Sequence, residues 1–130
     1  TSDTADDAER AMKGADVAVT CGGATASESF DRSSLELDQS DAIASMLARA
    51  EALRVPTVVL VLAPGAVVLP WRDKATAILL MFLSGEATGL AAADVLGGRF
   101  SPSGRLPVTL PSSEDDTLRP CSGRGPCRYS

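Results

Sequence analysis

A group of charged side chains follows the first apolar segment of this chain, and these are the residues best placed to do chemistry. Residues 17–21 form a short apolar run, and the polar loop that comes after it, residues 24–39, carries Glu28, Asp31 and Arg32. Loops that follow the C-terminal ends of strands commonly hold ligand chemistry in α/β proteins. A glutamate there can act as a general acid or base. It can equally be an ordinary solvated residue, so both interpretations stay open.

The chain has no histidine and only three cysteines, which narrows the chemistry further. Histidine is the commonest metal ligand and general base, and we predict no metal and no other cofactor. Cys21 lies in an apolar run and is predicted to be a buried thiol. Cys121 and Cys127 lie in a Gly/Pro-rich tail at a spacing that permits a disulfide, which would indicate an oxidising compartment. Two free thiols are the alternative.

The net charge of −5 argues against a nucleic-acid partner, because neutralising phosphates requires a basic face. The longest uncharged stretch, residues 55–71, is interrupted by prolines and is shorter than a membrane span, so we predict a chain that does not cross a membrane. The chain begins at Thr1 and not at methionine, as expected of a processed form or a fragment. Length and composition are those of one ordinary globular domain.

Helical and strand patterns alternate along the chain, which predicts an α/β layered fold with a mostly parallel sheet. A continuous β-branched run bounded by prolines, residues 57–62, is typical of a strand buried on both faces. The prolines near residues 100–111 indicate an edge strand. Helices are expected from about residue 4 to Gly14, from Ser40 to about 54 and over 86–96, and further strands at 17–21 and 77–82.

Several segments carry a resemblance to one known family. Residues 100–111 read Phe-Ser-Pro-Ser-Gly-Arg-Leu-Pro-Val-Thr-Leu-Pro, which resembles the signature that closes the α/β-sandwich domain of glycoside hydrolase family 3. Upstream segments are similar to the same domain in the same order, at residues 15–19, 28–32, 57–62, 67–71 and 85–98. Ser29 departs from the pattern, since a glycine is expected after the loop glutamate.

The resemblance implies an incomplete family domain. Residues 1–111 are expected to form a layered α/β sandwich with helices flanking a mostly parallel sheet and a C-terminal edge strand. Residues 112–130 are expected to be a polar, weakly ordered tail. The match to the family's Pro-Trp corner implies that Trp71 packs in the core and is not a platform for a sugar ring.

Family 3 contains retaining exo-β-glycosidases such as β-glucosidases, β-xylosidases and N-acetylglucosaminidases. Retention requires two carboxyl groups roughly 5 Å apart, a nucleophile and a general acid/base. The resemblance implies that Glu28 is the candidate acid/base and that Asp31 and Arg32 shape its loop. The family's nucleophile and most sugar contacts come from an upstream barrel that these residues do not include. We therefore predict no activity for the chain alone.

Two hypotheses for function follow. In the first, the chain is part of an enzyme that hydrolyses β-glucosides or β-xylosides, and it meets a β-linked sugar only when the barrel is supplied. In the second, it is a non-catalytic structural or accessory subunit derived from this domain. In both, a protein partner or the missing remainder of the same protein is expected to cover the truncated sheet. Export is common in the family, which, with a Cys121–Cys127 bridge, favours an exported or lumenal location.

Overall fold

The computed structural model describes residues 5–29 and 32–117. The predicted alternation of helices and strands is confirmed in this part of the chain. The elements run in the order α1 (Ala5–Met12), β1 (Ala18–Gly23), α2 (Ser40–Leu53), β2 (Thr57–Leu62), the 3-10 turn η1 (Arg72–Lys74), β3 (Ala77–Leu80), α3 (Thr88–Leu96) and the 3-10 turn η2 (Glu114–Asp116).

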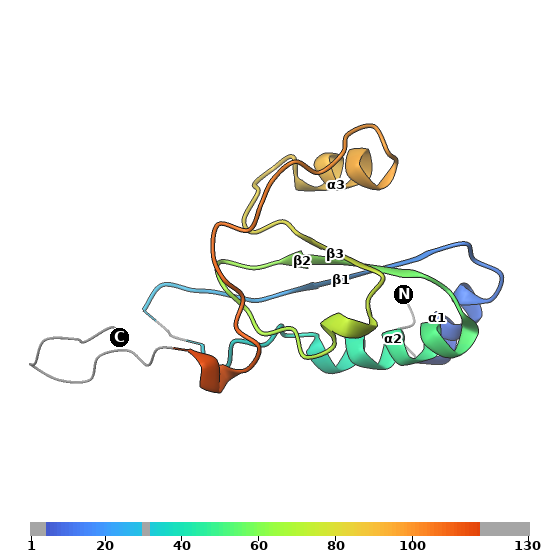
Figure 1. Cartoon of the computed structure of the whole chain (residues 1–130), viewed down its shortest axis with the longest axis horizontal. Coiled ribbons are helices and arrows are strands. Elements are labelled where there is room, and N and C mark those ends of the chain that lie inside the picture. The colour runs from blue at the N-terminus through green and yellow to red at the C-terminus, as the bar shows by residue number, and fades with distance from the viewer. Residues whose placement is uncertain (1–4, 30–31, 118–130) are drawn as a thin grey trace, which may run out of the picture.

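The three strands form a parallel sheet in the order β1-β2-β3. Helices α1 and α2 lie on one side of this sheet and α3 lies on the other (Figure 1). The chain therefore has the predicted α/β layered architecture. Because side chains alternate across a strand, the register assigns each strand residue to one of two faces. We call the face toward α2 the inner face and the face toward α3 the outer face.

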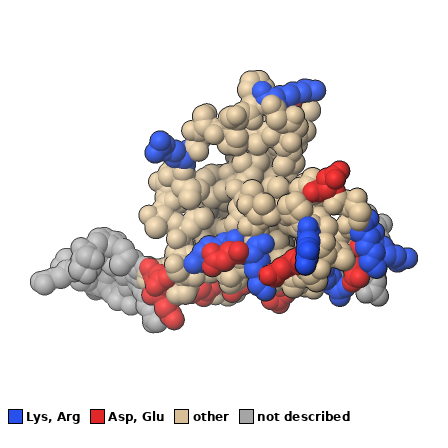
Figure 2. Space-filling view, turned by 45° about the vertical axis from the view of Figure 1, so that its right-hand side comes forward, with Lys and Arg blue, Asp and Glu red and all other residues tan. Residues whose placement is uncertain are grey.

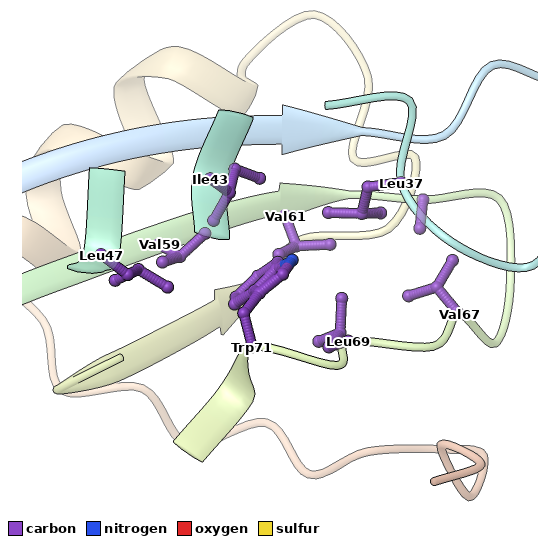
Figure 3. Close-up of a cluster of buried hydrophobic side chains, with 9 residues drawn as sticks. Leu37, Ile43, Leu47, Val59, Val61, Val67, Leu69 and Trp71 are labelled. Carbon is purple, nitrogen blue, oxygen red and sulfur yellow. The ribbon is translucent and has the colours of Figure 1, made fainter. Parts of the chain in front are cut away.

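The inner face carries the hydrophobic core. Val59 and Val61 of β2 are fully buried there against Ile43 and Leu47 of α2. The indole of Trp71 packs into the same cluster and is only 4% exposed (Figure 3), which agrees with the predicted core position. The buried cluster comprises Leu37, Ile43, Leu47, Val59, Val61, Ala63, Val67, Leu69 and Trp71.

The outer face is less covered, above all at the edge strand β1. Val19 is 45% exposed, and Cys21 on the same face is also exposed. The prediction of a buried Cys21 thiol is therefore wrong. Its side chain points away from α2, and α3 does not close over it. Leu90 of α3 is itself 75% exposed, so this helix leaves much of its own apolar surface uncovered.

The edge strand predicted at residues 100–111 does not form. The structure assigns no β pairing to this segment, and Leu106 and Val108 are exposed. Prolines at positions 102, 107 and 111 remove the N–H groups that a ladder needs. The segment instead crosses from the α3 side of the sheet to the α2 side, where it ends at η2 (Figure 1). Cys121 and Cys127 lie outside the described residues.

No helix in the described ranges combines the length and the apolar composition needed to cross a membrane.

Candidate functional site

The loop between β1 and α2 contains Glu28, at the end of the sheet where the parallel strands finish. Glu28 is exposed and lies in a turn with Ser29. Ser29 has a φ of 67°, in the left-handed region that glycine adopts most easily. This geometry gives a physical reason for the glycine that the family pattern places here. Asp31, the second predicted loop residue, lies outside the described residues.

Arg32 connects the two ends of this loop. Its Nη1 donates to the Thr25 carbonyl oxygen at 2.6 Å, on the side that follows β1. On the side that precedes α2, its Nη2 donates to the Glu36 carbonyl at 2.7 Å and pairs with Asp38 Oδ1 at 2.7 Å. Its Nε donates to the Ser34 carbonyl at 3.2 Å. A single planar guanidinium thus joins segments that are far apart along the loop.

Asp38 is the anionic partner at the base of the loop. Its carboxylate accepts hydrogen bonds from the Thr25 hydroxyl and, at 2.9 Å, from the Thr25 backbone N–H. The hydroxyl bond first, and then the bond from Arg32, lower the pKa of Asp38 from 3.8 to about 2. The sequence shows Asp38 only as one of several loop charges. No local pattern distinguishes it, because its partner Thr25 is thirteen positions away.

The paired glycines at the end of β1 seat the loop against the core. A Cβ at Gly22 would lie 2.5 Å from Ile43 Cδ1, so a larger residue there would force the buried Ile43 side chain of α2 to move. The Gly23 N–H donates to Gln39 Oε1 at 2.9 Å, and its carbonyl accepts from the Asp38 N–H at 2.9 Å. Packing and loop attachment therefore account for both glycines without a bound ligand.

The C-terminal segment also holds the loop between β1 and α2. Glu114 Oε1, in η2, accepts hydrogen bonds from Ser34 Oγ at 2.6 Å and from the Leu35 N–H at 2.7 Å. These bonds, the one from Ser34 first, lower the pKa of Glu114. On its other side, the Leu35 carbonyl accepts from the Val68 N–H at 3.0 Å. Sequence analysis did not single out Glu114, which is 79 positions from Leu35.

Glu28 is an exposed carboxyl group on a loop that is tied at its base. The neighbouring carboxylates of Asp38 and Glu114 are already engaged as hydrogen-bond acceptors. Within the described ranges, no group of three or more acidic, cysteine or histidine side chains could hold a metal ion. Glu28 can therefore serve as a general acid or base, provided that a second carboxyl group is supplied from elsewhere.

Comparison with known proteins identifies the family. The model of the glycosyl hydrolase family 3 C-terminal domain matches residues 2–127. This chain belongs to that family, as the sequence resemblance implied. The match continues past residue 111 and through η2, so the segment that carries Glu114 lies inside the matched region.

The relatives are much longer proteins. Beta-glucosidase B of Emericella nidulans is 35% identical over 121 residues, which cover 91% of this chain and 14% of that protein. Thermostable beta-glucosidase B of Acetivibrio thermocellus is 38% identical, over 81% of this chain and 14% of that protein. The chain thus spans about one-seventh of the curated relatives it matches.

Solved structures agree with this assignment. The beta-D-glucoside glucohydrolase from Trichoderma reesei superposes with a TM-score of 0.79 at 26% identity, over 93% of this chain and 18% of that one. Beta-glucosidase 3B from Thermotoga neapolitana, in complex with glucose, gives a TM-score of 0.74 at 32% identity, over 87% of this chain and 17% of that one. Both likenesses extend over most of the present fold.

Proposed function

We propose that this chain is the closing part of the sandwich domain of a retaining β-glycosidase, and that Glu28 is the general acid/base of the complete enzyme. The observation that carries the proposal is the position of Glu28. It is an exposed carboxyl group at the strand ends, on a tied loop, in a chain of family 3. Because the similar proteins are named β-glucosidases, the proposed substrates are β-glucosides, with β-xylosides as the alternative.

In this mechanism Glu28 acts twice. As an acid it gives its proton to the oxygen of the leaving group while a carboxylate nucleophile attacks the sugar ring. As a base it then takes a proton from the water that hydrolyses the glycosyl-enzyme intermediate. The nucleophile and the pocket for the sugar would come from the part of the enzyme outside these 130 residues. The isolated chain is therefore expected to be inactive.

Arg32 and Asp31 are proposed to shape the loop and not to touch the sugar. The support for Arg32 is its set of contacts, since its guanidinium is used on the backbone of Thr25, Ser34 and Glu36 and on the carboxylate of Asp38. A group engaged on four partners has little capacity left for a ligand. For Asp31 the proposal rests on the sequence resemblance alone.

We further propose that the remainder of the same enzyme covers the outer face of the sheet. Val17 and Val19 of this region are about half exposed, a state that a finished sheet avoids. Charged side chains gather over the lower layer in Figure 2, whereas the upper part, toward α3, is mostly uncharged. A surface with few charges is typical of the core of a protein–protein interface, where charged residues are depleted.

The proposal can be tested in a completed enzyme, in which this chain replaces the matched region of Thermotoga neapolitana beta-glucosidase 3B. Its hydrolysis of aryl β-glucosides is measured with a poor and with a good leaving group, for the unchanged chain and for Glu28→Gln. An acid catalyst matters most when the leaving oxygen is basic. We expect Glu28→Gln to lower turnover about 100-fold or more on the poor leaving group and far less on the good one. Glu51→Gln, an exposed change on α2, is the matched control.

Equal turnover for Glu28→Gln and the unchanged chain would exclude Glu28 as the acid/base. Hydrolysis of the same glycosides by the isolated chain, abolished by Glu28→Gln, would show that no barrel is needed. If the completed enzyme folds but has no activity, and the isolated chain is instead found in a defined complex, the accessory-subunit hypothesis is favoured.

A further inference from the structure

The C-terminal turn η2 holds the loop of Glu28 through one carboxylate. Glu114 Oε1 lies 2.6 Å from Ser34 Oγ and 2.7 Å from the Leu35 nitrogen, so a single oxygen receives two hydrogen bonds from adjacent residues of the loop. Ser34 Oγ in turn accepts from the Glu36 N–H at 3.1 Å. The bonds therefore form a short chain from the backbone of Glu36 through Ser34 to Glu114.

The turn that presents Glu114 has internal support of its own. Ser113 and Asp116 form a reciprocal capping box, in which the Ser113 N–H donates to Asp116 Oδ2 at 3.1 Å. The Thr117 hydroxyl donates to the Glu114 carbonyl at 2.7 Å. Just upstream, the partly buried side chain of Leu110 packs against the hydrophobic core. Glu114 is thus carried by a turn that is anchored on the core and is not a free side chain on an unattached tail.

The loop segment is held from two opposite sides. On one side, the Val68 N–H donates to the Leu35 carbonyl at 3.0 Å, and Glu36 makes a parallel bridge with Val68. On the other side, the Leu35 N–H and the Ser34 hydroxyl reach Glu114. Arg32 connects this segment to the start of the loop, because its guanidinium donates both to the Glu36 carbonyl and to the Thr25 carbonyl. Residues 26–29, which include Glu28, make none of these contacts.

We propose that Glu114 is a positioning residue that fixes the Glu28 loop against the end of the sheet. The importance of Glu114 for catalysis rests on the proposed function of Glu28. The effect of Glu114 on the loop is independent of that function. A carboxylate accepting two short hydrogen bonds limits the motion of the segment from Ser34 to Glu36. Because Arg32 connects that segment to Thr25, the carboxylate of Glu114 thereby also limits the positions open to residues 26–29, which include Glu28.

Amide hydrogen exchange on the whole chain, followed by NMR, tests the attachment directly. In Glu114→Ala the amide of Leu35, which loses its acceptor, is expected to exchange about tenfold faster or more. The amide of Glu36 keeps its acceptor, Ser34 Oγ, and is expected to accelerate less. The amides of Val59 and Val61 in β2 are expected to keep their rates. Asp115→Asn, a change at the adjacent exposed carboxylate, is the matched control and is expected to leave all four unchanged.

The conservative variant separates positioning from a general effect of charge. Glu114→Gln keeps a carbonyl oxygen that can accept the same two bonds, so it is expected to restore most of the protection that Glu114→Ala removes. When Ser34 is already replaced by alanine, adding Glu114→Ala should accelerate exchange at Leu35 less than it does in the unchanged chain. The reason is that Ser34 and Glu114 are hydrogen-bonded to each other. Unchanged exchange at Leu35 in Glu114→Ala would overturn the proposal. So would equal acceleration at Val59, which would mean a loss of overall stability.

The completed enzyme connects the attachment to catalysis. There, Glu114→Ala is expected to lower turnover most on the poor leaving group, like a weaker form of Glu28→Gln, and Glu114→Gln is expected to recover it. If exchange at Leu35 is faster in Glu114→Ala but turnover is normal in Glu28→Gln, the attachment by Glu114 is supported and the proposed function of Glu28 is refuted. If exchange at Leu35 is unchanged in Glu114→Ala but turnover is lost in Glu28→Gln, the attachment is refuted and the proposed function of Glu28 is supported.

Discussion

The two faces of the same three-stranded sheet have different surroundings. On the inner face, α2 and the segment that ends at Trp71 bury Val59 and Val61 completely. On the outer face Leu60 is buried, but Val19 is 45% exposed and Leu62 is 36% exposed. A chain that folded as a complete domain would have little reason to leave one of two similar faces open.

This difference separates the face that the chain covers by itself from the face that we propose the rest of a longer protein covers. The inner face, with the base of the Glu28 loop attached to it, is finished within these residues. The outer face is left partly uncovered. Since the relatives are about seven times longer, the unfinished parts are where the rest of the enzyme is proposed to meet this one.

Matched leucine truncations on the two faces should give the largest contrast. Leu47→Ala is expected to lower the free energy of unfolding by about 2–5 kcal/mol, because it empties a fully packed site. Leu62→Ala, which removes the same atoms from the outer face, should cost less than about 1 kcal/mol. Urea unfolding followed by circular dichroism measures both, and equal losses would contradict the comparison.

A methyl group added at the close contact under α2 should have the next largest effect. Gly22→Ala is expected to cost about 1–3 kcal/mol, since the new Cβ would lie within 2.5 Å of Ile43 Cδ1 in the buried core. Gly89→Ala in α3 is the control, because nothing lies within 4 Å of a Cβ there. It should stabilise the helix by no more than about 1 kcal/mol. A neutral Gly22→Ala would show that the inner face is loosely packed.

A substitution at Ser29, whose backbone is in the left-handed region, should stabilise the chain, unlike the substitutions at Leu47 and Gly22. Ser29→Gly is expected to raise the free energy of unfolding by up to about 1 kcal/mol, since its φ of 67° is costly for a residue with a Cβ. Ser33→Gly, an exposed change at a residue without positive φ, should slightly lower it. Thermal unfolding of the two variants decides between these outcomes, and a destabilised Ser29→Gly would argue against the left-handed turn.

Acid should loosen the base of the loop before it affects the core. The folded-state pKa of Asp38, about 2, lies below its ordinary 3.8, so its contribution to stability is present above pH 4 and is lost as the pH falls through 2. Amide exchange at Thr25, whose N–H it accepts, should accelerate in this window before that of Val61 does. In Asp38→Ala, which has no acceptor for this N–H, the Thr25 amide is expected to be fast throughout. Protection of Thr25 that persists in the variant would refute the assigned role.

Local patterns in the sequence predict most of the helices and strands. The β-branched run between prolines predicts β2 (Thr57–Leu62) with its observed bounds, and helical spacing predicts the start of α2 at Ser40. The place of Glu28 after a strand makes it a candidate, and its role as acid/base is implied by the resemblance to the family's loop and stays a prediction. Each of these signals is contained in a few neighbouring residues.

The misses depend on contacts between distant segments. Cys21 was predicted to be buried because its neighbours are apolar, but its exposure is decided by what lies across the sheet. The edge strand at residues 100–111 was expected from a motif whose prolines leave it unpaired. The bonds from Glu114 to Ser34 and Leu35 join positions about eighty residues apart, which no local pattern reveals.

The rate at which Cys21 is alkylated tests the contrast between the faces most directly, with mass spectrometry used to follow this cysteine apart from Cys121 and Cys127. In the isolated chain we predict a rate within about tenfold of that in the urea-unfolded chain, because the thiol is exposed on the outer face. In the longer protein that we propose, the same thiol should react far more slowly. A protected Cys21 in the isolated chain, or equal rates in both proteins, would contradict the account.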